Sequence, residues 1–353
     1  MLAEVVDAVI GIDTHRDSHE VEIADSRGTP IATMRIGNDS AGFTQLLAAV
    51  VEVAPGPRVA VSLEGSRSYG VGLARALSAA GLLVIECEQP ARRQRRGRGK
   101  SDPIDAHLAV LAALRLDADR LPGLRADGDR EALRILLVAR QEITTASTAQ
   151  TNRLRALLLA GDDADRRTAR SALTASALAD LGRRELSAAA GRDHAVRHAE
   201  IQRLALALQQ ARRELKVNRR QLLAIVADIA PGLIDRYGVG PVSAAQAVVS
   251  FSHPGRCRNE AAFAALGGTN PIPASSGRIV RHRLNRGGDR ALNRAIHTIA
   301  ATRIRSCPRT RAYVERRTAQ GKTPREIRRC LKRYIARELY RQLTRSMTSA
   351  NRP

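Results

Sequence analysis

The sequence predicts an α/β unit followed by a mostly helical chain, and three observations support this fold class. Short apolar, β-branched runs alternate with helical patterns over the first 125 residues. A long stretch with helical periodicity follows, from 130 to 229. The remaining chain combines helical segments with strong positive charge. We therefore expect three domains, over residues 1–125, 126–229 and 230–353.

The first domain has a recognisable order of elements. Apolar or alternating strands are predicted over residues 5–13, 19–24, 30–36, 58–64 and 82–86, the first three as an antiparallel meander. Helices are predicted over 40–53 and 69–80, and a third begins near Asp102. The order β-β-β-α-β-α-β-α is that of the RNase H-like (RuvC-like) fold. In that fold, acidic residues on the first strand, the fourth strand and the last helix converge on divalent cations.

Four carboxylates occupy those positions: Asp13, Glu64, Asp102 and Asp105. A carboxylate at the end of a buried strand is costly unless it is paired or bound to a metal. Oxygen ligands suit Mg²⁺ or Mn²⁺, so we expect these four residues to be catalytic metal ligands. The alternative is structural: Asp102 as the N-cap of a helix that starts with Pro103, and Asp105 in its first turn.

Other polar residues nearby carry weaker signals. We expect Asp17, Glu20 and Glu22 to face solvent. His107 is expected to be a solvent-facing or core histidine rather than a metal ligand.

The charge of the chain predicts a polyanionic partner. The 58 Lys and Arg residues outnumber 35 Asp and Glu residues, for a net charge of +23. Residues 278–353 hold 22 of the cations and only 4 of the acids. A second basic cluster precedes Asp102 and comprises Arg92, Arg93, Arg95, Arg96, Arg98 and Lys100. Because aromatic residues make up only 2 %, we expect salt-sensitive phosphate contacts rather than base stacking.

The middle domain is predicted to be a helical arm. Residues 130–160 and 196–229 read as long helices, and the Gly-, Ala- and Ser-rich stretch 161–193 as a short helical connection of poor definition. The second helix carries an apolar seam with heptad spacing, which favours a coiled coil: Ile201, Leu204, Leu208, Ala211, Leu215, Asn218, Leu222, Ile225 and Ile229. The two helices could pair as a hairpin, between subunits, or within a bundle.

The C-terminal domain contains two candidate phosphate-contacting elements. Around residues 229–246, a helix, a Gly-Val-Gly turn and a second helix suggest a helix-hairpin-helix element, in which Gly238 and Gly240 expose backbone amides to phosphate. Further on, Ser276 precedes a glycine and is followed by basic side chains, namely Arg278, Arg281, Arg283 and Arg286. A serine there is either a turn residue or a nucleophile at a phosphodiester.

Cysteine usage and hydropathy predict a cytoplasmic, nucleoid-associated protein. Cys87, Cys257, Cys307 and Cys330 have neither metal-ligand nor redox spacing and read as reduced thiols. The N-terminus lacks the pattern of a signal peptide, and no apolar run reaches the roughly 18 residues of a membrane span.

Taken together, the motifs resemble the IS one-ten type of insertion-sequence transposases and the related Piv-like DNA invertases. The resemblance rests on GIDTHRDSH (11–19), SLEGS (62–66), KSDPIDAHLA (100–109) and, near the C-terminus, ALGGTNP, SSGR and LNRGGDRALNRAIH. It implies a metal-binding tetrad of Asp13, Glu64, Asp102 and Asp105, and a serine nucleophile at Ser276, with Ser275 as the other candidate. It also implies donor and target DNA, a structured guide RNA, and a homo-oligomer, dimer or tetramer, that combines the acids of one subunit with the serine of another.

Three alternatives share many of these residues. A DNA invertase would differ only in its DNA sites. A junction-resolving nuclease of RNase H-like fold would use metal-activated water and need no serine. An architectural nucleic-acid-binding protein would use the carboxylates only as helix caps.

Overall fold

A computed structural model describes residues 1–353 except 67, 88–101, 119–120, 126, 186–190, 275–281 and 351–353, and it leaves the side chains of 102–103 and 348–350 undescribed. Two compact units are present. The first, the N-terminal unit, comprises Met1–Glu131 together with Phe251–Phe263. The second, the C-terminal unit, comprises Ala132–Ser250 and Ala264–Pro353. The division into three domains stays a prediction.

The N-terminal unit is built on a mixed five-stranded sheet. After the short helix η1 (Leu2–Glu4), the strands are β1 (Ala8–Thr14), β2 (Ser18–Asp25), β3 (Pro30–Gly37), β4 (Val59–Leu63) and β5 (Leu83–Glu86). Their order in the sheet is β3-β2-β1-β4-β5. Strand β2 is antiparallel to both β1 and β3, whereas β4 is parallel to β1 and β5. The meander of the first three strands is therefore confirmed.

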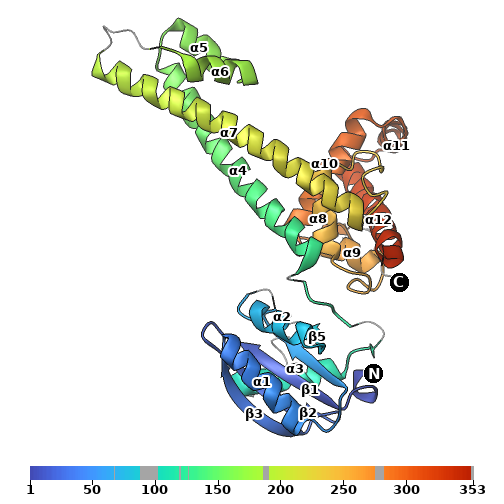
Figure 1. The fold of residues 1–353 in the computed structure, drawn as a ribbon. Helices are drawn as coiled ribbons and strands as arrows, with labels where there is room; N and C mark the ends of the chain where they lie inside the picture. Colours follow the sequence, from blue (N-terminus) through green and yellow to red (C-terminus); the bar gives the residue numbers. More distant parts are fainter. Residues whose placement is uncertain are drawn as a thin grey trace. The chain divides into compact units, whose positions relative to one another are not determined.

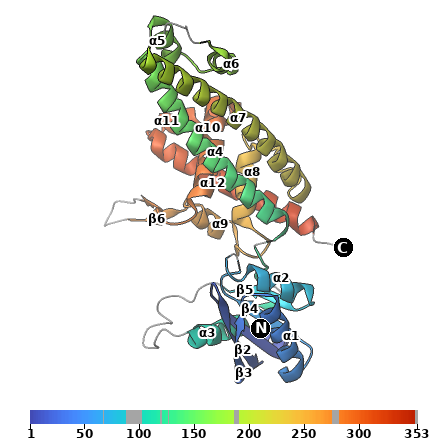
Figure 2. The same cartoon turned by 60° about the vertical axis from the view of Figure 1, so that its left-hand side comes forward.

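Helices cover both faces of this sheet (Figures 1 and 2). Helices α1 (Ser40–Val53) and α2 (Val71–Ala79) lie on one face, and α3 (Asp102–Leu114) lies on the other. The face covered by α1 and α2 buries even-numbered residues of β1, Ile10 and Ile12, against side chains of the two helices: Leu46, Val50, Leu73 and Leu77. The α3 face buries a second, smaller set: Val9, Ala24, Ala60, Ile85, Val110 and Ala113. The predicted order of elements and the mixed α/β class are confirmed, while the assignment to the RNase H-like fold stays a prediction.

Two long helices pack on each other within the chain, α4 (Gly128–Leu159) and α7 (Arg192–Ile229), and from Ala132 onward both belong to the C-terminal unit. The Asn218 side-chain amide of α7 donates to the Leu136 carbonyl of α4 at 2.8 Å. At one end of this pair lie α5 (Asp163–Arg170) and α6 (Ala175–Arg183), in both views of the chain (Figures 1 and 2). Residues 161–185 thus contain two short helices with defined ends, where a poorly defined helical connection is predicted. Gly182 lies inside α6 because Leu178 and Leu181 give that short helix a buried face.

The predicted seam of α7 is buried along much of its length, but not to its end. Ile201, Leu204, Leu208, Asn218 and Leu222 are buried. Beyond Leu222 the buried residue is Val226, while Ile225 is only half-buried. A straight helix has 3.6 residues per turn and drifts off a strict heptad repeat. This drift explains why Val226, four residues after Leu222, is buried in place of Ile225. The helix packs within the chain, and a coiled coil between subunits stays a prediction.

The rest of the C-terminal unit is mostly helical, as expected. The remaining elements of the chain are α8 (Pro241–Phe251), α9 (Glu260–Leu266), the hairpin strands β6 (Pro271–Pro273) and β7 (His282–Leu284), α10 (Arg290–Ser306), α11 (Pro308–Ala319) and α12 (Pro324–Ala350). The boundary between the two units falls inside α9, after Phe263. Within the described ranges, no helix is long and apolar enough to span a membrane.

The helix-hairpin-helix prediction is wrong for its first helix. Helix α7 stops at Ile229, and residues 231–238 form turns and bends instead of a helix. Pro231 cannot continue the hydrogen-bonding pattern, and Gly232 takes a positive φ of +77° that suits a helix end. The Gly-Val-Gly turn does lead directly into α8, and Gly238 has a φ of +76°.

Candidate active site

Asp13 and Glu64 lie side by side along the backbone at the carboxyl ends of neighbouring parallel strands. Asp13 is near the end of β1, and Glu64 directly follows β4. The register pairs Ile12 with Leu63, and the Glu64 amide donates to the Ile12 carbonyl at 3.1 Å. The Thr14 hydroxyl donates to the Glu64 carbonyl at 2.8 Å, which ties the two strand ends together. Carboxyl ends of adjacent parallel strands are where α/β proteins commonly build their sites.

The same face of the sheet carries helix α3. Gly11 of β1 lies against this helix so closely that an added Cβ would stand 2.1 Å from the Ala106 carbonyl oxygen. Asp13 is two residues beyond Gly11, and strand side chains alternate, so Asp13 belongs to the α3 face. It is a buried carboxylate, 9 % exposed. On β4, Ser62 pairs with Gly11 and therefore faces α3 as well. Glu64 comes two residues after Ser62, just beyond the end of β4, and continues the same side of the strand.

Helix α3 contributes the other two predicted acids. Asp102 is its first residue, and Asp105 lies one turn in and is half-buried. The Asp102 side chain lies outside the described part of the structure. Among the side chains that are described, no group of three or more His, Cys, Asp or Glu could hold a metal ion. The tetrad, its metal and the competing capping role of Asp102 therefore all stay predictions.

Two contacts near these acids were not anticipated. Glu22 of β2 is 6 % exposed, and His107 Nδ1 of α3 lies 2.6 Å from its Oε1 atom. The expectation that Glu22 faces solvent is therefore wrong. Glu22 pairs with Gly11, and α3 packs closely over Gly11, so the helix also covers Glu22. His15 Nε2 lies 3.4 Å from Asp13 Oδ2. Asp17 is exposed, as predicted.

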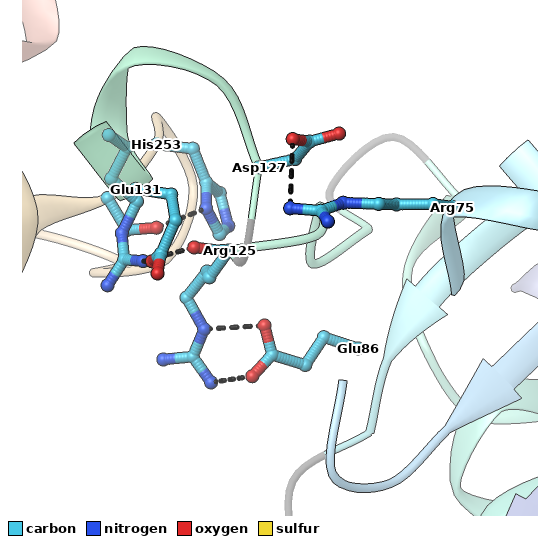
Figure 3. Close-up of polar contacts among 8 residues, drawn as sticks. Arg75, Glu86, Arg125, Asp127, Glu131 and His253 are labelled. Atoms are coloured by element: carbon cyan, nitrogen blue, oxygen red, sulfur yellow. Dashed lines mark hydrogen bonds and ion pairs between the residues drawn. The ribbon is translucent and has the colours of Figure 1, made fainter. Parts of the chain in front are cut away.

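A second polar cluster of the N-terminal unit surrounds Glu86, at the end of β5 (Figure 3). Arg125 and Glu86 form a buried two-bonded ion pair, in which Nε donates to Oε2 at 2.7 Å. His253, from the 251–263 segment, lines a cavity of about 300 Å³ with this pair. Burial lowers the pKa of His253, and the neighbouring cations Arg256 and Arg125 act in the same direction. The cluster joins chain segments that lie far apart in sequence, so no local pattern predicts it.

Many of the predicted nucleic-acid contacts fall outside the described residues. These are Ser275, Ser276, Arg278, Arg281 and the whole cluster from Arg92 to Lys100. Arg283 lies on β7, at the base of the hairpin that leads to the serines, and it is exposed together with Arg286. Gly240 is half-buried, and an added Cβ there would meet no described atom within 4 Å, while Gly238 packs against α10. Contact of these residues with phosphate stays a prediction.

Comparison with known proteins defines the class to which this fold and site belong. One family model, of the DEDD type and described as a transposase, matches residues 10–160. This range includes all four predicted acids. A second model, described as the transposase IS116/IS110/IS902 family, matches residues 233–315 and spans both candidate serines. The chain is thus a transposase, a class of enzymes that cut and rejoin DNA. It belongs to the IS110-type family of insertion-sequence transposases.

Two relatives agree with this assignment. The mini-circle putative transposase for IS117 of Streptomyces coelicolor is 32 % identical over 153 residues, 42 % of this chain and 37 % of that protein. The insertion element IS900 uncharacterized 42 kDa protein of Mycobacterium paratuberculosis is 28 % identical over 359 residues, 88 % of this chain and 89 % of that protein. The match thus spans little more than a third of the length of the IS117 protein. Because the family is named for its acids, the chain is not classed with the serine recombinases.

Proposed function

We propose that this protein exchanges DNA strands by transesterification in an RNase H-like site, with Asp13, Glu64, Asp102 and Asp105 as metal ligands and Ser276 as nucleophile. One observation carries the proposal. The β1–β4 register sets the strand ends bearing Asp13 and Glu64 next to each other, on the sheet face covered by the helix that bears Asp105.

The donor chemistry fits a divalent cation. Asp13 is nearly buried, and a buried carboxylate is stable when it is paired or bound to a cation. Carboxylate oxygens are hard ligands that suit Mg²⁺ or Mn²⁺, and such an ion polarises a phosphodiester when bound. His15 lies beside Asp13 and is placed to orient that carboxylate.

The proposed reaction has two matching steps. The Ser276 Oγ attacks the scissile phosphorus, so an Oγ–P bond forms while one P–O bond of the strand breaks. The departing oxygen leaves as a hydroxyl after taking up the proton that the serine gives up. A hydroxyl from a second DNA end then attacks the phosphoserine and restores the free serine. Arginines around the serine stabilise the negative charge that builds on the phosphate oxygens.

Adduct trapping tests the nucleophile. Wild-type protein incubated with DNA carrying the element's ends and Mg²⁺ should form a covalent protein–DNA species that survives denaturation. Ser276→Ala should abolish that species and retain DNA binding, and Ser275→Ala is the matched control that should keep it. An adduct that persists in Ser276→Ala but disappears in Ser275→Ala would move the role to Ser275. Free 5′-phosphate ends without any adduct would instead support a nuclease that uses water.

Acid variants test the metal ligands. Asp13→Asn should abolish cleavage and leave DNA binding intact, whereas Asp17→Asn changes an exposed carboxylate of the following turn and should be silent. Cleavage that survives both Asp13→Asn and chelation of divalent cations would refute the proposed site.

The proposal extends to partners. We propose that a structured RNA encoded beside the gene pairs with donor and target DNA, and that the active protein is a dimer or tetramer. The family resemblance supports both points, and the 2 % aromatic content leaves little scope for reading bases by stacking. RNA that co-purifies with the protein, and the molar mass of the complex by light scattering, test these two points. The sequence flanking the gene distinguishes a transposase from an invertase.

A further inference from the structure

The C-terminal unit contains a strongly cationic cavity of about 770 Å³. The β6–β7 hairpin forms one wall, and α11, α12 and the turn between them form the other. We call this space the basic cavity. Its described lining includes six cationic side chains: Arg283, Arg317, Lys322, Arg329, Lys332 and Arg333. The cavity therefore concentrates positive charge over a surface much larger than a single phosphate group.

Cations outnumber carboxylates among the described lining residues of the basic cavity. Among its described lining residues, Glu326 is the sole carboxylate. That carboxylate already accepts hydrogen bonds from the Thr323 backbone amide and hydroxyl, each at 2.9 Å, at the start of α12. Its remaining charge cannot offset six cations, so an anionic ligand would relieve their mutual repulsion.

Lys332 shows how closely the cations are crowded. Its ammonium group donates to the Asn293 side-chain oxygen at 2.6 Å, a neutral partner. Burial lowers the pKa of Lys332, and the nearby Arg328 cation adds to the effect. A half-buried ammonium group beside other cations is costly, and a phosphate oxygen in the cavity would stabilise its charged form.

We propose that the basic cavity binds several consecutive phosphates of the DNA strand being exchanged, with Lys322 and Arg329 as phosphate contacts. The inference rests on the proposed function, because it takes the serines between β6 and β7 to act on DNA. The strands that precede and follow the serines in the chain, β6 and β7, form a wall of the cavity. Backbone phosphates, rather than bases, fit a lining that is rich in arginine and holds one described aromatic side chain, Tyr334.

The test is the salt dependence of DNA binding by the full-length protein. Lys322 and Arg329 are both exposed, so Lys322→Ala/Arg329→Ala should fold normally. The control, Arg309→Ala/Arg325→Ala, removes the same charge from exposed positions of α11 and α12 that do not line the cavity. Binding of a short mixed-sequence DNA duplex and of an RNA hairpin is measured by fluorescence anisotropy over a range of KCl concentrations. The conservative variant Lys322→Arg/Arg329→Lys tests for rescue.

The expected result is specific to the cavity and to DNA. Each lost phosphate contact lowers the slope of log affinity against log salt by about 0.9 on duplex DNA, so the alanine pair should lower it by about 2. The control pair should leave the slope nearly unchanged, the conservative pair should restore it, and RNA binding should be unaffected. An equal decrease of the slope in both alanine pairs would show that the cavity contributes only to the general positive charge of the surface, and it would overturn the proposal. A loss confined to RNA would overturn it in favour of an RNA site.

Failure of this proposal is distinguishable from failure of the proposed function. The binding measurement needs no cleavage, and Ser276→Ala should keep the wild-type slope. If Ser276→Ala still forms the adduct while the cavity variant loses DNA affinity, the nucleophile is misassigned and the cavity proposal stands. If Ser276→Ala loses the adduct as expected but the cavity variant keeps the wild-type slope, the cavity proposal is refuted and the proposed function stands.

Discussion

Replacing Gly11 with alanine should displace the helix that carries two of the predicted metal ligands. The new Cβ would stand 2.1 Å from the Ala106 carbonyl oxygen and 2.7 Å from Val110 Cγ2, whereas ordinary contact begins at 3.4 Å. The nearest atom is backbone, so no side-chain rotation relieves the clash. Helix α3 must therefore move outward by about 1 Å, a displacement of the size that can cost about 100-fold in catalysis when it affects reacting groups.

The energetic cost follows from the same clash. Overpacking a buried site costs about 1–3 kcal/mol, and a rigid backbone contact belongs at the upper end of that range. Alanine returns about 0.5–1 kcal/mol because glycine loses more backbone entropy on folding. We therefore expect Gly11→Ala to lower the free energy of unfolding of the N-terminal unit by about 2 kcal/mol.

Two measurements check this prediction. Urea unfolding followed by circular dichroism gives the stability change, and hydrogen exchange of residues 102–114 reports the loosened helix. DNA cleavage should fall by about 100-fold. The matched control is Gly123→Ala in the same unit, where an added Cβ meets no described atom within 4 Å. Wild-type stability, exchange and cleavage in Gly11→Ala would show that β1 and α3 do not lie in this close contact.

Three further perturbations address other parts of the fold. Glu86→Gln leaves Arg125 buried without its counter-charge and should cost about 3–5 kcal/mol in urea unfolding; replacing both residues with apolar ones should recover much of that loss. Asn218→Ala removes the hydrogen bond to the Leu136 carbonyl and should lower stability by about 1–2 kcal/mol, read from the same unfolding curves. Burial lowers the pKa of His19 in the folded state, so the unfolded chain binds more protons below its ordinary pKa of about 6.5. Acidification through that pKa should therefore destabilise the wild type more than His19→Phe, as thermal unfolding at matched pH values would show.

Local patterns were sufficient to predict the architecture of the N-terminal unit. Charged and apolar residues alternate from Glu20 to Ile23 of β2. Helix α1 has an Asp39 cap whose carboxylate accepts from the Gly42 amide at 2.9 Å, so the helix start is encoded nearby. The burial of Glu22 was missed because it depends on Gly11 of another strand and on a helix far along the chain. The helical character of 161–193 was predicted, but the bounds of α5 and α6 were not, because their buried side chains pack on residues of α4 and α7.

The candidate site was predictable to the same extent. The positions of Asp13 and Glu64 at strand ends follow from local patterns, and the register that makes them neighbours follows from the expected strand order. The Glu86–Arg125 pair and the basic cavity were not predictable, because each joins segments that no short motif connects. Two of the cavity's cations lie four residues apart on α12, Arg329 and Arg333, a spacing that is visible only once the helix is placed.

The membership of Phe251–Phe263 in the N-terminal unit limits how this protein can be dissected. The chain passes between the two units three times, after Glu131, after Ser250 and after Phe263. A fragment truncated near residue 131 would lack His253 and would open the Glu86–Arg125 pair to water. Inactivity of such a fragment would therefore say nothing about its carboxylates. Grafting 251–263 back through a flexible linker is the appropriate route to a minimal N-terminal unit.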